Sequence, residues 1–257
     1  MMIEASATVA ASSVPTVDAA TMAEVDRLAM EEYGITLLQM MEQAGSHLAE
    51  VVRVELDGEL SGRRIVVAAG PGDNGGGGLA AARHLVNRGA QVQVVLATPA
   101  LRLSEAARHQ LATLLAMGTS CCVTVYDIDA AELAATLAEA DLVVDALLGY
   151  RAVGPPRGAV ADLLGFVARS GRPVVSLDVP TGLDPDTGVA STEVIRARAT
   201  LTLALPKPGL LHGHGARLAG RLYLADIGLP ASLYASMGID VGPVFAPGRI
   251  LHLLGEP

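Results

Sequence analysis

Apolar and polar residues follow two different periods along the chain. From residue 21 to 52, apolar residues recur every three or four positions, which predicts two helices with Gly34 as the break between them. Beyond Gly62, short runs rich in Val, Ile and Leu alternate with longer alanine-rich stretches of helical period. The short runs predict strands within 64–70, 91–97, 121–126, 141–149, 173–180, 199–206 and 221–228. The longer stretches predict helices within 79–89, 104–118, 130–140 and 158–171.

This alternation of strands and helices predicts an α/β fold, with a mostly parallel central sheet covered by helices on both faces. The 257 residues are enough for one large domain with a sizeable buried core. We expect that domain to cover residues 21–257. The first twenty residues are mostly small and polar, without the basic opening and apolar run of a signal peptide, and are expected to form a flexible tail.

Composition narrows the class of partner. A net charge of −9 leaves no general basic surface for a nucleic-acid backbone or an anionic membrane, so neither is expected as a partner. The absence of Trp and an aromatic content of 3% also remove most stacking platforms for single-stranded nucleic acid. A small-molecule ligand is therefore favoured. The adjacent Cys121 and Cys122 are interpreted as strand residues rather than a disulfide, which predicts a reducing, cytoplasmic setting.

Polar side chains follow several predicted strands at the point where each strand ends. The first strand leads into Asp73 and Asn74, the fourth ends in Asp145, and the fifth leads into Asp178 and Thr181. Parallel strands bring their carboxyl ends to one edge of the sheet, where ligands of such folds bind. Carboxylate, amide and hydroxyl oxygens gathered there are suitable ligands for a hard cation.

The run between Gly70 and Gly78 contains six glycines and joins a predicted strand to a predicted helix. Glycine lets the backbone approach a ligand closely, and free N–H groups at the start of a helix suit a phosphate. The spacing matches neither the dinucleotide-binding fingerprint nor a P-loop. The run could also be a tight connection, but such a turn needs only one or two glycines, so ligand binding is favoured.

Six stretches, taken together and in order, are similar to a known family. They are GITLLQMMEQAG (34–45), GPGDNGGGG (70–78), DALLGYRAVGPPRG (145–158), SLDVPTGLDPDTG (176–188), ALPKPGLL (204–211) and GRLYLADIGLP (220–230). They resemble the YjeF N-terminal domain family, whose catalytic members are NAD(P)HX epimerases.

The resemblance implies a Rossmann-like three-layer αβα sandwich, commonly a homodimer, that interconverts the R and S forms of hydrated NADH and NADPH (NADHX and NADPHX). Hydration adds a hydroxyl at carbon 6 of the nicotinamide ring, and a separate dehydratase restores only one epimer. The protein would supply that dehydratase with the epimer it accepts, as a step in nicotinamide nucleotide repair.

Carried over by position, the resemblance implies a potassium ion held by Asn74, Asp145 and Thr181. It places Asp178 at the substrate, as the candidate for proton transfer at the carbon 6 hydroxyl. The other substrate-lining residues that it implies are Asp73, Asn74, Gly75, Gly76 and Gly77 in the glycine run, and Gly149, Tyr150, Arg151, Ala152, Val153, Gly154 and Pro155 after the fourth strand.

The chain departs from the family's pattern within the glycine run. Members usually read Asn-Asn-Gly-Gly-Asp-Gly where this chain reads Asp73 to Gly78, so an aspartate is missing at Gly77 and a new carboxylate appears at Asp73. A catalytically weakened nucleotide-binding or scaffold module on the same fold therefore stays open as an alternative. The epimerase is favoured because a scaffold has little need of four polar groups at one strand edge, and the chain retains Asn74, Asp145, Asp178 and Thr181.

Overall fold

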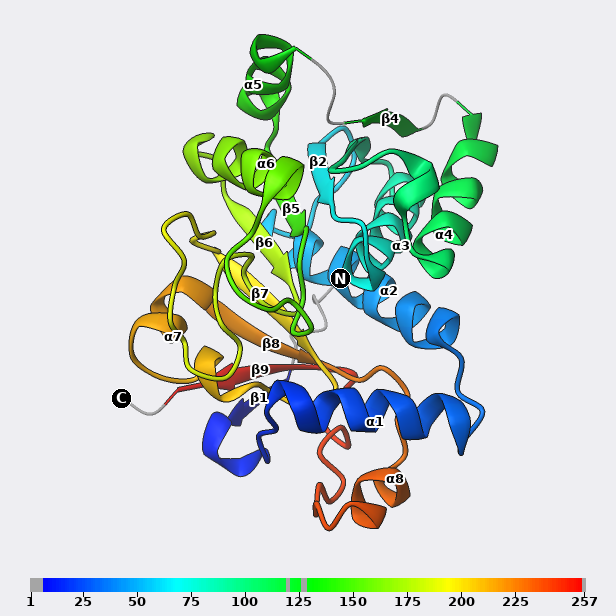
Figure 1. Ribbon diagram of the computed structural model, residues 1–257, viewed down its shortest axis with the longest axis vertical. Helices are drawn as coiled ribbons and strands as arrows, with labels where there is room; N and C mark the ends of the chain where they lie inside the picture. The colour runs from blue at the N-terminus through cyan, green and yellow to red at the C-terminus, as the bar shows by residue number, and fades with distance from the viewer. Residues whose placement is uncertain (1–6, 119–120, 126–128, 256–257) are drawn as a thin grey trace.

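The computed structural model describes residues 7–118, 121–125 and 129–255. Within these residues one sheet of nine strands runs through the molecule, in the order β1-β9-β8-β7-β6-β5-β2-β3-β4 (Figure 1). Neighbouring strands are parallel, except that β8 and β9 are antiparallel. The strands are β1 (Ala7–Ala10), β2 (Arg64–Ala69), β3 (Gln91–Leu96), β4 (Cys121–Val125), β5 (Leu142–Ala146), β6 (Val174–Leu177), β7 (Ala199–Leu203), β8 (Arg221–Ala225) and β9 (Ile250–Leu254).

Helices cover both faces of the sheet, as Figure 1 shows for α5 and α6 on one side and α2, α3 and α4 on the other. The helices are α1 (Ala19–Glu31), α2 (Leu37–Glu55), α3 (Asp73–Asn87), α4 (Glu105–Ala116), α5 (Ala130–Glu139), α6 (Gly158–Arg169), α7 (Gly213–Ala219) and α8 (Ala231–Ser236). Short 3-10 turns occupy Ala11–Ser13, Ala100–Arg102 and Pro208–Leu210. The predicted α/β sandwich with a mostly parallel sheet is confirmed, as are the seven predicted strands, now β2 to β8.

The beginning of the chain differs from the prediction. The first six residues lie outside the described part, but residues 7–20, which were expected to be a flexible tail, are ordered parts of the fold. Strand β1 pairs in parallel with β9, with Ala7 opposite Leu251, and Val17 donates from its backbone N–H to the Pro206 carbonyl at 3.2 Å. The sequence does not reveal this, because β1 is four residues long and its partner strand lies at the other end of the chain.

The glycine run is the second difference, because most of it is helix rather than loop. Helix α3 begins at Asp73, so the glycines from Gly75 to Gly78 lie within its first two turns. A β-carbon on Gly75 would lie 2.0 Å from the Gly70 carbonyl oxygen, and one on Gly78 would lie 2.5 Å from the Ala146 β-carbon. The low helix propensity of glycine, about 1 kcal/mol per residue relative to alanine, predicts a loop here. Close packing of α3 against the sheet decides otherwise.

Helices α1 and α2 form one wall of the site described below, and local signals position both. The Asp18 carboxylate caps α1 by accepting a hydrogen bond from the Thr21 N–H at 2.7 Å. Thr36 and Gln39 form a capping box at the start of α2, and Gly34 supplies the positive φ of 66° between the helices. None of the helices in the described residues combines the length and the apolar character needed to cross a membrane.

Candidate active site

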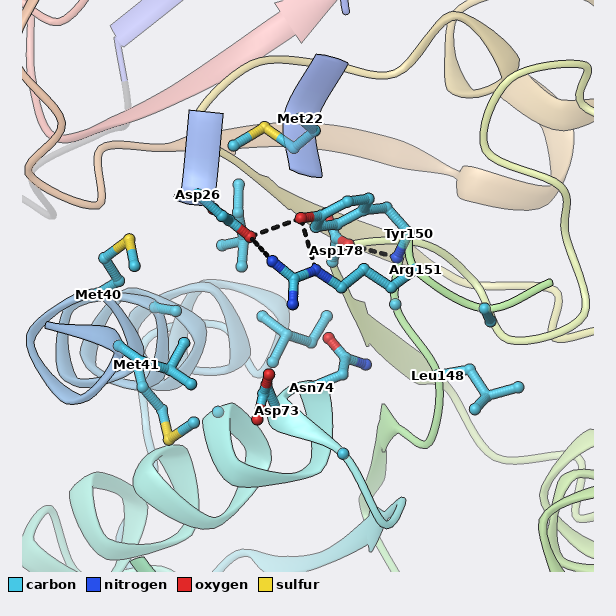
Figure 2. A pocket seen from close by; sticks show the side chains of 18 of the residues that line it. Met22, Asp26, Met40, Met41, Asp73, Asn74, Leu148, Tyr150, Arg151 and Asp178 are labelled. Atoms are coloured by element: carbon cyan, nitrogen blue, oxygen red, sulfur yellow. Dashed lines mark hydrogen bonds and ion pairs between the residues drawn. The ribbon is translucent and has the colours of Figure 1, made fainter. Parts of the chain in front are cut away.

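A cavity of about 330 Å³ opens at the carboxyl ends of the central strands, between the start of α3, the segment after β5, and helices α1 and α2 (Figure 2). This volume is within the range of small-molecule sites. Its polar lining comes mainly from Asp26, Asp73, Asn74, Tyr150, Arg151, Asp178 and Lys207. Its apolar lining includes Met22, Leu37, Met40, Met41, Ala44, Leu177, Leu203 and Ile227. The cavity therefore combines a cluster of charged and polar side chains with an extensive apolar lining.

Asp178 and Lys207 form a buried ion pair at the floor of the cavity. The Lys207 Nζ donates to Asp178 Oδ1 at 2.7 Å, and neither side chain is more than 3% exposed. The other carboxylate oxygen of Asp178 accepts the Tyr150 backbone N–H at 2.8 Å. Lys207 also donates to the Leu203 carbonyl at 3.0 Å. The pair therefore places a base and a proton donor side by side in a site screened from water.

The ends of strands β6 and β7 bring this pair together through two tight turns of the same kind. Asp178 and Ala204 are non-glycine residues with φ of 66° and 64°. A hydrogen bond closes each turn between the residues on either side of the positive-φ residue. The Val179 N–H donates to the Leu177 carbonyl at 2.9 Å, and the Leu205 N–H donates to the Leu203 carbonyl at 2.8 Å. Three-residue turns with positive φ are strained, and strain of this kind gathers at functional sites. Adjacent strands therefore end in matching turns that direct Asp178 and Lys207 toward each other.

Asp145, at the end of β5, lies beneath this cavity and is fully buried. Its carboxylate accepts hydrogen bonds from the Thr181 Oγ1 at 2.7 Å, the Thr181 N–H at 2.9 Å and the Ser176 Oγ at 2.8 Å. Burial raises the pKa of the Asp145 carboxyl above its usual range. Neutral donors are the only partners that the described residues supply, so a cation would be a favourable further neighbour for this carboxylate.

Asn74 completes the residues that could hold a cation. Its Nδ2 is buried and has no hydrogen-bond partner among the described residues. With the amide turned over, the unpartnered atom is an oxygen, which is a cation ligand. A β-carbon on Gly149 would lie 3.0 Å from both Asn74 Oδ1 and Asp178 Oδ2, so Asn74 and Asp178 converge on that glycine. The carboxylate, hydroxyl and amide oxygens of Asp145, Thr181 and Asn74 are a donor set that fits potassium.

Asp26, Tyr150 and Arg151 form a second polar cluster, at the edge of the cavity. The Tyr150 hydroxyl donates to Asp26 Oδ2 at 2.5 Å, and the Arg151 Nη2 donates to the same oxygen at 2.9 Å. Arg151 Nε donates to the Tyr150 hydroxyl oxygen at 2.9 Å. Burial raises the pKa of Asp26, and burial together with the Asp26 charge raises that of Tyr150, so the tyrosine is a neutral donor. These bonds tie the segment after β5 to α1.

The structure divides the predicted substrate-lining residues into three groups. Those that line the cavity are Asp73, Asn74, Gly77, Gly149, Tyr150, Arg151, Ala152 and Asp178. Gly75 and Gly76 do not line it, because their α-carbons face Gly70 and the Met41 side chain. Gly154 and Pro155 line a neighbouring cavity of about 520 Å³ that also contains Thr181, while Val153 is 96% exposed and lines neither.

Sequence reasoning missed Lys207 and Asp26 as candidate site residues. Lys207 follows an apolar strand and stands between two prolines, a signal equal to the one that revealed Asp145 and Asp178. Asp26 has no such signal, because it lies in the amphipathic pattern of α1, where a charged residue is ordinary.

A family model described as YjeF-related protein N-terminus matches residues 37–209, a range that includes the glycine run, Asp145, Asp178 and Lys207. The chain belongs to this family. Asp26 lies outside the matched range.

Several curated relatives are similar over most of the chain. The NAD(P)H-hydrate epimerase of Dehalogenimonas lykanthroporepellens is 41% identical over 233 residues, covering 90% of either chain. The bifunctional NAD(P)H-hydrate repair enzyme of Moorella thermoacetica is 40% identical over 220 residues, covering 86% of this chain and 42% of its own. The chain thus spans about two fifths of the length of that bifunctional relative. The crystal structure of yeast ynu0 matches with a TM-score of 0.80 at 28% identity, covering 93% of this chain and 100% of that one.

Proposed function

We propose that this protein is an isomerase that interconverts the R and S epimers of hydrated NADH and NADPH. The observation that carries the proposal is the buried pair of Asp178 and Lys207 at the floor of a cavity of ligand size. Relatives named NAD(P)H-hydrate epimerase, similar along nearly their whole length, support the same substrate.

Epimerisation requires carbon 6 of the hydrated ring to lose and regain its configuration. Asp178 is positioned to take the proton of the carbon 6 hydroxyl. In a ring-opening route the oxygen then forms a carbonyl, the bond from carbon 6 to N1 breaks, and the electron pair goes to N1. Closure on the opposite face returns the proton from Asp178 to the oxygen and gives the other epimer. Lys207 keeps the Asp178 carboxyl group in place throughout these steps.

We also propose that a potassium ion binds at Asn74, Asp145 and Thr181. The buried Asp145 carboxylate and the unpartnered amide of Asn74 support this assignment. When bound, the ion would supply a fixed positive charge that offsets the carboxylates of the site. The chain's own part is to hold that charge close to Gly149, on which Asn74 and Asp178 converge.

The partners and setting follow from the proposed reaction. A separate NAD(P)HX dehydratase would consume one of the epimers, and relatives named bifunctional NAD(P)H-hydrate repair enzyme support a place in the repair of hydrated NAD(P)H. A homodimer and a cytoplasmic setting remain part of the proposal, and sedimentation of the purified protein would decide the first.

The decisive experiment measures conversion of R-NADHX to S-NADHX by the purified protein, followed by chromatography, with and without potassium. Turnover above the spontaneous rate is expected. A parallel Gly77→Asp variant restores the carboxylate usual in the family; its β-carbon would meet the flexible end of Leu177 at 2.7 Å, a contact that a rotamer change relieves. Turnover only in that variant, or in neither protein, would contradict the epimerase proposal. The natural protein would then be assigned to the alternative, a non-catalytic binding module.

A further inference from the structure

We propose that Arg151 is the receptor for the diphosphate of the dinucleotide, held in position by Asp26 and Tyr150. This inference rests on the proposed function for the identity of the ligand, and it assigns a charged part of that ligand to one side chain. Two cations line the cavity, Arg151 and Lys207. Lys207 is fully buried and bonded to Asp178, so it has no accessible face to offer a phosphate.

The bonding of Arg151 leaves one edge of its guanidinium free. Nε donates to the Tyr150 hydroxyl oxygen and Nη2 to Asp26, both at 2.9 Å. Nη1 has no hydrogen-bond partner within the described part of the chain, and half of the side chain is exposed. A guanidinium that is held on two sides and free on a third is already ordered. It therefore has little conformational entropy left to lose when it binds an anion.

The position of Arg151 agrees with the path that a dinucleotide must take. Asp178 and Lys207 at the floor would receive the hydrated ring, and a cavity near the lower limit of ligand sites has no room for both halves of the dinucleotide. The rest of the ligand must leave through the opening. Figure 2 shows the Arg151 guanidinium pointing toward Asp26, above Asp73 and Asn74 at the start of α3.

Asp26 and Tyr150 act on the ligand through Arg151. Asp26 comes from α1, and its side chain is only 14% exposed, so the carboxylate that holds Arg151 is itself well packed although Arg151 remains half exposed. Tyr150 stacks its ring near both cations, 5.6 Å from Arg151 Cζ and 5.4 Å from Lys207 Nζ. The same aromatic ring is therefore within cation–π distance of both Arg151 and Lys207.

The test compares a ligand that contains the diphosphate with a ligand that contains only the ring and its ribose. ADP-ribose contains the diphosphate without the nicotinamide, and nicotinamide riboside contains the ring without a phosphate. Their dissociation constants are measured by calorimetry for the unchanged protein and for Arg151→Gln, Arg151→Lys and Arg157→Gln. Arg157 is the matched control, because it is an exposed arginine near Arg151 that does not line the cavity.

Arg151→Gln is expected to weaken ADP-ribose binding roughly tenfold to a hundredfold, the value of a charge-assisted hydrogen bond to phosphate. The same variant should change the dissociation constant of nicotinamide riboside less than twofold. For ADP-ribose, the dissociation constant of Arg151→Lys should lie between those of the unchanged protein and Arg151→Gln, and that of Arg157→Gln should match the unchanged protein. Equal weakening of both ligands, or of neither, would overturn the proposal. Binding needs no turnover, so an inactive protein with Arg151-dependent ADP-ribose binding would refute the epimerase and keep this receptor.

Discussion

Two buried carboxylates, Asp178 and Glu55, lie at opposite ends of the strands and have different surroundings. Asp178 follows β6 at the carboxyl edge and pairs with the fully buried Lys207. Glu55 ends α2 near the first residues of β7 and β8, where it accepts from Arg198 at 2.9 Å and also pairs with Arg221. Both arginines are 47% exposed, and Glu55 lines neither of the two cavities described above.

The comparison shows that burial and ion pairing by themselves do not mark a functional site. At Glu55 the charge is satisfied by two arginines and by the Tyr223 hydroxyl at 3.3 Å, with ordinary helical backbone on its own side. At Asp178 the backbone is held at positive φ, and the residue lines a cavity of ligand size. Access and backbone strain distinguish the reactive carboxylate from the one that joins α2 to the sheet.

The largest expected effect is on turnover in Asp178→Asn. Removing a positioned acid or base lowers the rate about a hundredfold to ten-thousandfold. Asparagine tolerates the positive φ of this position and can still accept from Lys207, so the fold should persist, with a stability lowered by the loss of a buried ion pair. Epimerase kinetics and circular dichroism of the variant measure both effects. Unchanged turnover would show that Asp178 takes no part in the mechanism. Asp178 would then be a structural carboxylate, as Glu55 is.

Glu55→Gln should lower stability without loss of turnover. Removing one member of a buried ion pair costs 3–5 kcal/mol, and the half-exposed arginines reduce this to about 2 kcal/mol in the free energy of unfolding. Denaturant unfolding and steady-state kinetics of the same preparation give both values. A drop in kcat beyond twofold would contradict the assignment of Glu55 to a purely structural role.

Potassium should stabilise the protein through Asp145. Because the folded-state pKa of Asp145 is raised, this carboxyl favours folding below its unfolded pKa and loses that contribution as the pH rises through the folded pKa. A cation that stabilises the ionised form should therefore raise the melting temperature more at pH 8 than at pH 5. At ten times its dissociation constant the gain is about 1.4 kcal/mol.

The control for the potassium effect replaces the ion by N-methylglucamine at equal ionic strength. Asp145→Asn should abolish the difference between the two salts, while Glu55→Gln should keep it. A potassium effect that survives in Asp145→Asn would place the ion elsewhere.

The smallest expected effect concerns Asp73, whose carboxylate lines the cavity below Arg151. Because it repels the substrate's diphosphate, Asp73→Asn should lower the KM for NADHX by less than tenfold and leave kcat nearly unchanged. The initial-rate kinetics of the two proteins measure this. A rise in KM would mean that Asp73 supports the site, as a cation ligand or a partner of Arg151, rather than opposing substrate binding.

Much of the fold was predictable because its elements are locally encoded. The seven apolar runs from 64 to 228 carry the strand pattern in themselves, and the helices between them carry their own period and caps. Asp145 and Asp178 could be placed at one edge by the rule that parallel strands end together. The glycines from Gly75 to Gly78 were misjudged, because propensity describes the isolated chain and not the close approach of α3 to the sheet.

The sequence by itself determined the α/β class, the carboxyl edge that carries the chemistry, and a family whose residues imply the ligand. The tertiary structure decided which groups meet at that edge. Lys207 reaches Asp178 because β6 and β7 are neighbours and end in matching turns, and Asp26 reaches Tyr150 across 124 residues of sequence. The physical reason is that a contact between distant residues depends on the order of the strands and the packing of α1, and neither leaves a local pattern in the sequence.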